Sequence, residues 1–173
     1  MKRIQASLLA ALLTLSAAAV FAEEANGAYG NGAAKIDTNL TIQDMLTYAI
    51  QDEYMARAEY TAIMDKFGAG RPFSSIKNAE STHIGWLNGA FSEFGLAIPP
   101  DRGADRVILP ASLKQAYQSG VQAEIDNIAM YDRFISTTLV QDPKNANLKQ
   151  LFENLKRGSE NHLKAFRNQL SKY

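Results

Sequence analysis

The chain has 173 residues, 18 basic and 18 acidic side chains, and no cysteine. This length allows one domain with a hydrophobic core. The charges are balanced, and the sequence has no basic stripe of the kind that binds nucleic acid. Because cysteine is absent, disulfides and thiolate ligands are excluded, and any bound metal must be held by His, Asp, Glu or water.

The first 22 residues have the pattern of a secretory signal peptide. Lys2 and Arg3 precede an apolar run over residues 6–20, and Val20-Phe21-Ala22 is a small-x-small cleavage signal. A membrane anchor is the alternative, but the run is short for a span of about 20 residues. We therefore expect cleavage after Ala22, export to the periplasm or medium, and no membrane span in the mature protein.

The rest of the chain predicts an all-α domain behind a short leader. Residues 23–40 are rich in Gly, Ala and Asn, which predicts a flexible leader before a domain over residues 41–173. Helical periodicity without a competing strand pattern predicts four helices, with Gly120 as a candidate kink in the third. They are expected over residues 41–67, 72–94, 112–139 and 145–170. Two helical hairpins in parallel would need residues 95–111 as a long crossover.

Glu80 and His83 form a Glu-x-x-His pair on one face of the second predicted helix. That face also carries Phe73, Ile76, Ile84 and Leu87, so the pair points into an apolar stripe where a lone charge is costly. Such a pair can hold a metal in a helix bundle. Taken alone, the pair fits a hydrogen-bonded core histidine beside a helix-surface glutamate better than it fits a metal site, so other segments must supply further ligands.

The first and third predicted helices contain an internal repeat. Residues 51–60 align without gaps on residues 122–131 and share a Gln, a Glu, an Ala and a Tyr. The shared Glu53 and Glu124 lie on apolar faces. Arg57 could pair with Glu53, but no cation lies at helical spacing from Glu124, which therefore needs a metal or a distant partner. The shared tyrosines, Tyr60 and Tyr131, are expected in the core, where their hydroxyls need partners such as a ligating carboxylate.

The fourth predicted helix supplies the second histidine of the chain. Aligning His83 with His162 places Glu80 opposite Ser159, and His162 again lies on an apolar face. Glu160 is a poor substitute because basic residues surround it at helical spacing. Asp52 and Glu59 are rival ligands, but their counterparts in the repeat, Ala123 and Met130, rank them below Glu53. Glu53 and the Glu80/His83 pair differ in height by about one helical turn.

This set of residues resembles the ferritin-like di-metal carboxylate pattern, in which each half supplies a Glu and a Glu-x-x-His. The strings at 51–60, 71–76 and 159–166 are more closely similar to an uncharacterised, often exported family called domain of unknown function 2202. The resemblance implies a four-helix bundle with two iron or manganese ions. The implied ligands are Glu53, Glu80, His83, Glu124 and His162, with Tyr60, Tyr131 and Ser159 beside them. Ser159 departs from the pattern, which has Glu there.

Three functions follow as alternatives. The first is an oxidoreductase that oxidises iron(II) or reduces peroxide or dioxygen and takes electrons from an external donor. The second is a cell-envelope protein that binds or buffers metal without turnover, which the missing glutamate favours. The third is a structural bundle whose inward polar groups bond one another. Burying three carboxylates and two imidazoles is costly unless all are satisfied, which favours a metal site.

Overall fold

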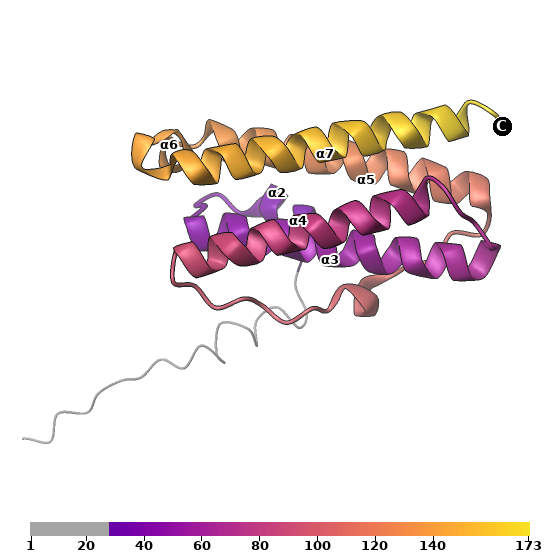
Figure 1. The fold of residues 1–173 in the computed structure, drawn as a ribbon, viewed down its shortest axis with the longest axis horizontal. Helices are drawn as coiled ribbons and strands as arrows, with labels where there is room; N and C mark the ends of the chain where they lie inside the picture. Colours follow the sequence, from indigo (N-terminus) through magenta and orange to yellow (C-terminus); the bar gives the residue numbers. More distant parts are fainter. Residues whose placement is uncertain (1–27) are drawn as a thin grey trace, which may run out of the picture.

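The computed structural model describes residues 28–173, and every regular element in this part of the chain is helical (Figure 1). The all-α prediction is therefore confirmed, whereas the predicted signal peptide lies outside the described residues. The long helices are α3 (Ile42–Phe67), α4 (Phe73–Glu93), α5 (Leu113–Ser136) and α7 (Ala146–Leu170). Shorter elements are α2 (Asn31–Ile36), α6 (Thr138–Gln141) and the 3-10 helices η2 (Gly103–Arg106) and η3 (Pro143–Asn145).

Local sequence signals account for the ends of α3. Thr41 and Asp44 form a reciprocal capping box, in which each side chain accepts a hydrogen bond from the other residue's backbone N–H, at 3.2 and 2.9 Å. Gly68 ends the helix at φ 61°, a left-handed conformation that glycine adopts without steric cost. The predicted bounds of the first helix are thus confirmed.

The third helix is shorter than predicted. It ends at Ser136, because the Thr137 hydroxyl accepts a hydrogen bond from the backbone N–H of Val140 at 3.3 Å and starts α6. Gly120 does not interrupt α5. A Cβ at Gly120 would lie 2.8 Å from the ring of Phe166, so this glycine lets α5 and α7 approach closely.

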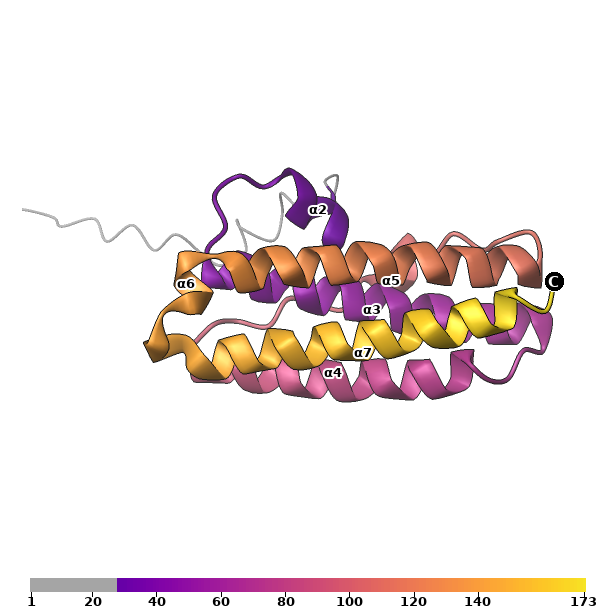
Figure 2. The same ribbon diagram turned by 90° about the horizontal axis from the view of Figure 1, so that it is seen from above.

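The long helices form two antiparallel hairpins, α3 with α4 and α5 with α7 (Figures 1 and 2). The connection between α4 and α5 runs back along the whole bundle, so α4 and α5 are parallel (Figure 1). This crossover is attached to α3. Arg57 pairs with Asp101 at 2.5 Å, and Gly103 lies so close that a Cβ there would be 2.2 Å from the backbone oxygen of Tyr54.

The hydrophobic core has two clusters of buried side chains along the bundle. One gathers residues such as Leu46, Phe91 and Phe134, and the other gathers residues such as Phe73 and Phe166. The spacing of polar and apolar residues along α3 places Glu53 between Ile50 of the first cluster and Tyr60 of the second. The middle of the bundle therefore holds polar side chains between two apolar layers.

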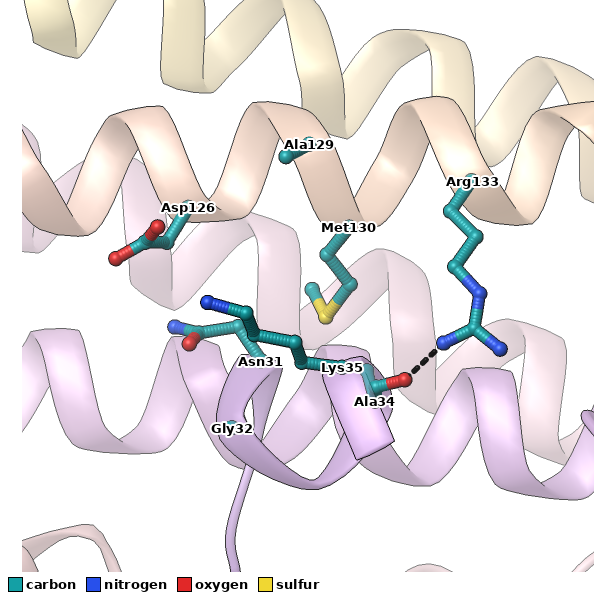
Figure 3. Close-up of a pocket in the computed structure, with 8 residues that line it drawn as sticks. All are labelled: Asn31, Gly32, Ala34, Lys35, Asp126, Ala129, Met130 and Arg133. Atoms are coloured by element: carbon teal, nitrogen blue, oxygen red, sulfur yellow. Dashed lines mark hydrogen bonds between the residues drawn. The ribbon is translucent and has the colours of Figure 1, made fainter. Parts of the chain in front are cut away.

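Residues 28–40 differ from the flexible leader expected over 23–40. The backbone N–H of Gly30 donates to Gln51 at 3.0 Å, and Asn31 donates twice to Asp52, at 2.9 and 2.7 Å. The Arg133 guanidinium donates to the carbonyl oxygen of Ala34 (Figure 3) and also to that of Asp37. α2 thereby packs on α3 and α5 (Figure 2). These partners are distant in sequence, so local composition gave no sign of them.

No helix within residues 28–173 is long and apolar enough to cross a membrane.

Candidate metal centre

Each of the long helices contributes to one polar cluster in the middle of the bundle. The five side chains are between 2% and 8% exposed. They are Glu53 on α3, Glu80 and His83 on α4, Glu124 on α5 and His162 on α7. The structure thus brings together all five residues that the sequence singled out as ligands.

Glu80 is the centre of the cluster because its two carboxylate oxygens face different histidines. Oε2 lies 2.9 Å from Nδ1 of His83, and Oε1 lies 3.2 Å from Nδ1 of His162. Each histidine faces a second carboxylate as well: Glu53 is 3.2 Å from His83, and Glu124 is 3.4 Å from His162. Two groups of potential ligands result, Glu53–Glu80–His83 and Glu80–Glu124–His162, and they share Glu80.

The two tyrosines of the repeat join the halves of the cluster crosswise. Tyr131 on α5 donates to Oε1 of Glu53 at 2.8 Å, and Tyr60 on α3 donates to Oε1 of Glu124 at 3.1 Å. The carboxylate on each helix is therefore oriented by the tyrosine of the other helix. This exchange follows from the repeated Glu-to-Tyr spacing of seven residues and gives the cluster an approximate two-fold arrangement.

The link between α3 and α4 removes the expected difference in height between Glu53 and His83. Figures 1 and 2 show that α3 extends past the start of α4, and residues 68–72 lead the chain back along the bundle. The offset brings Glu53 and His83 level. The helices differ in length, and the link absorbs the difference.

The rival ligands considered from the sequence have other positions. Asp52 accepts hydrogen bonds from Asn31, and Glu160 lies 3.8 Å from Lys156 at the surface. Neither these residues nor Glu59 belong to the ligand groups found within residues 28–173. Ser159 is buried one turn before His162, also outside the ligand groups.

Residues 42–173 match the model of a family described as Uncharacterized protein domain (DUF2202). The chain belongs to the DUF2202 family. A relative, uncharacterised protein MJ0754 of Methanocaldococcus jannaschii, is 24% identical to it over 138 residues and 71% of each chain. A crystal structure of hypothetical protein MJ0754 from Methanococcus jannaschii has a TM-score of 0.65 at 21% identity, and covers 79% of this chain and 85% of that one. This likeness establishes a shared fold.

Burial and neighbouring charges set the protonation of the carboxylates in this DUF2202 domain. Burial raises the pKa of Glu53 well above its usual value, and the nearby charge of Glu80 adds to the increase. Burial also raises the pKa of Glu124. It would do the same for Glu80, but hydrogen bonds from His162 and His83 outweigh it and lower the pKa of Glu80 to about 2. The carboxylate between two imidazoles therefore stays ionised.

The histidines show the opposite balance. Burial would lower their pKa values, but hydrogen bonds to Glu53 and Glu80 raise the pKa of His83 to about 9. Hydrogen bonds to Glu124 and Glu80 raise that of His162 to about 10. Without metal, each Nδ1 thus carries a proton at neutral pH and donates it to the carboxylates around it. A bound cation would replace these protons and contact the same carboxylate oxygen atoms.

The donor set fits a hard divalent transition ion. Each ligand group offers carboxylate oxygens and one imidazole nitrogen, the donors that iron and manganese accept. Oε2 of Glu124 is buried and has no hydrogen-bond partner among the described residues. A buried carboxylate oxygen without a donor is costly, and a bound cation would satisfy it.

Sequence analysis did not identify two residues that lie beside His83. Gly158 on α7 leaves space for the imidazole, since a Cβ there would lie 2.6 Å from Cε1 of His83. Trp86, the single tryptophan of the chain, places its ring centroid 5.2 Å from that of His83 and is 44% exposed. Trp86 lies one turn after His83 on α4, a spacing that could have indicated the contact. For Gly158 no local signal existed.

Proposed function

We propose that this DUF2202 protein is a ferritin-like protein that binds two iron or two manganese ions in the buried cluster and reacts with peroxide or dioxygen. The observation that carries the proposal is the position of Glu80, whose two oxygens serve two adjacent ligand groups. One carboxylate shared by two such groups is the arrangement expected of a bridging ligand. The two antiparallel hairpins and their crossover support the ferritin-like assignment.

The residues would have distinct roles around the two ions. Glu53 and His83 would hold one ion, Glu124 and His162 the other, and Glu80 would bridge them. Tyr131 and Tyr60 would keep Glu53 and Glu124 in position by donating to one oxygen of each. When bound, iron or manganese supplies reversible one-electron chemistry. The apolar layers above and below exclude water from the protein groups.

A metal-buffering protein without turnover is the second candidate, and Ser159 favours it. The ferritin-like pattern has a glutamate where this chain has Ser159. The group around His162 therefore has one carboxylate fewer than that pattern would give it. Fewer anionic ligands leave an ion less tightly held and more easily exchanged. A bundle without metal is the third candidate. In that case, the imidazolium–carboxylate hydrogen bonds would be the whole function of the cluster.

Metal loading and iron oxidation distinguish these candidates. Iron(II) or manganese(II) is expected to raise the melting temperature, because ligands that bind only the native state stabilise it. Trp86 fluorescence should change with loading, because the indole is next to His83. The iron(II) form should then oxidise faster than iron(II) in buffer when peroxide or air is added, and repeatedly after re-reduction. Elemental analysis of protein purified without chelator identifies the ion.

Each contrary result selects another candidate. Stable binding without faster oxidation would leave the buffering protein. If neither iron(II), manganese(II) nor zinc(II) altered the melting temperature, the cluster would be structural. Glu160→Gln, at an exposed position outside the ligand groups, is the control for a general effect of charge loss on loading.

We further propose that the protein is exported, which the signal-peptide pattern of residues 1–22 supports. Its electrons would come from an external donor, since the chain has no cysteine for a redox centre of its own. Intact mass of the protein recovered from the periplasm or medium should correspond to a chain that begins at Glu23. Recovery of the full chain in the membrane fraction would contradict export with cleavage.

A further inference from the structure

A surface groove leads to one half of the metal centre and not to the other. It lies between the start of α4 and the second half of α7, and encloses about 380 Å³. The helices that form it run side by side in Figure 2. Its lining includes His162 itself, together with Arg71, Ser75, Asn161 and Ala165. A small molecule in this groove would therefore contact an imidazole of the Glu80–Glu124–His162 group.

The other histidine is covered on both sides. The indole of Trp86 lies beside the ring of His83, with ring centroids 5.2 Å apart. On the α7 side, the backbone at Gly158 is so near that a Cβ would lie 2.6 Å from the imidazole. None of the five main grooves on residues 28–173 is lined by His83. The two halves of the centre thus differ in access although they share Glu80.

The walls of the groove indicate the chemistry of what enters. The groove is lined by side-chain amides, one hydroxyl and the guanidinium of Arg71, and no carboxylate is among its lining residues. A divalent cation would find no anionic ligand on this route, and Arg71 would repel it. A small anion, or a neutral molecule that accepts hydrogen bonds, finds donors on several sides.

The ligand group at the inner end has spare capacity for such a molecule. Oε2 of Glu124 lacks a partner, and buried Ser159 stands where the ferritin-like pattern would add a carboxylate. Catalytic metal sites keep a position open for substrate, while structural sites are closed by protein ligands. The open side of this centre is therefore the side that the groove reaches.

We propose that the groove between α4 and α7 is the binding and entry site for a small oxygen-donor oxidant of the peroxide class, in neutral or anionic form, which reaches the centre at His162. This inference rests on the proposed di-metal function and adds the groove through which the oxidant reaches the centre.

The test uses azide as a small anionic probe with the full mature chain loaded with iron. Ser75→Phe places a large ring in the exposed wall of the groove. The rate constant for azide association should fall to a small fraction of its original value. Arg71→Ala should lower the affinity for azide about threefold, which is the effect expected of one exposed charge. The matched control is Ser92→Phe, the same change at an exposed position near the other end of α4. Metal affinity should be unchanged in all three variants.

A second measurement needs no metal. Diethyl pyrocarbonate modifies accessible imidazoles, and peptide mass analysis can count the modification at each histidine of the metal-free protein. Because protonation also slows this reaction, each histidine is compared with itself across the variants. Ser75→Phe should slow modification of His162 and leave that of His83 unchanged, and Ser92→Phe should slow neither.

The outcomes separate this inference from the proposed function. If metal binds but azide associates equally fast with Ser75→Phe, the entry site is wrong and the di-metal function stands. Modification of His162 that is equally fast in Ser75→Phe and in the unaltered protein would likewise overturn the route. If no metal binds, the proposed function fails and the oxidant site fails with it, while the modification pattern still shows whether the groove reaches His162.

Discussion

Replacing Glu80 by glutamine is expected to remove both metal ions. Its two carboxylate oxygens face His83 and His162, so it is the one side chain common to both ligand groups. We expect the affinity for each ion to fall by more than about a hundredfold, since losing even a hydrogen-bond partner of a ligand costs roughly ten- to a hundredfold. Calorimetric titration with manganese(II) or anaerobic iron(II) measures both steps.

Two further variants make this prediction specific. Glu53→Gln should weaken only the ion held with His83, because Glu53 belongs to one ligand group. Glu59→Gln is the matched control on α3, where burial also raises the carboxyl pKa but no ligand group includes the residue. Two tight ions bound by Glu80→Gln, or losses in Glu59→Gln as large as those in Glu80→Gln, would show that Glu80 does not bridge the centre. Circular dichroism checks that each variant remains helical.

Metal affinity is expected to depend steeply on pH. The pKa of His83 is about 9 and that of His162 about 10 in the metal-free protein, so both Nδ1 atoms are protonated at pH 7. Each ion must displace one of these protons, and its affinity should fall about tenfold for each pH unit below 9. Toward acidic pH the fall should steepen, because Glu53 and Glu124 also have raised pKa values and take up protons.

Calorimetry at pH 7 in buffers of different ionisation enthalpy counts the displaced protons. About two should be released when two ions bind, and His162→Asn should bind one ion and release about one. Binding without proton release would mean that the histidines are not ligands through Nδ1.

The same pKa values predict how the metal-free fold responds to pH. A histidine pKa raised above its usual 6.5 stabilises the fold fully below that pH, and the contribution is lost as pH rises through 9 and 10. The lowered pKa of Glu80 acts in reverse: its contribution is present above 4.5 and is lost as pH falls toward 2. Melting temperatures of the metal-free protein should therefore decline at both extremes, and bound metal should abolish the decline near pH 9.

The sequence by itself determined the four long helices, apart from the end of the third, and the side chains that they direct into the core. The capping box at Thr41 and the glycine at 68 are local signals, and local hydrogen bonds and backbone conformation set helix ends whatever the rest of the chain does. The inward direction of Glu53, Glu124 and His162 followed from helical periodicity, because residues on one face of a helix share one environment. The repeat of Glu and Tyr likewise predicted hydroxyl partners for the carboxylates, although not which ones.

The tertiary structure decided every relation between residues on different helices. Glu80 became common to both candidate ligand groups because α4 and α7 bring both histidines to it. The tyrosines exchanged partners because α3 and α5 face each other. Asp52 instead holds α2. The space that Gly158 leaves for His83 and the groove at His162 also arise between helices. Such contacts depend on the offset and distance of packed helices, and periodicity along one helix contains no information about either.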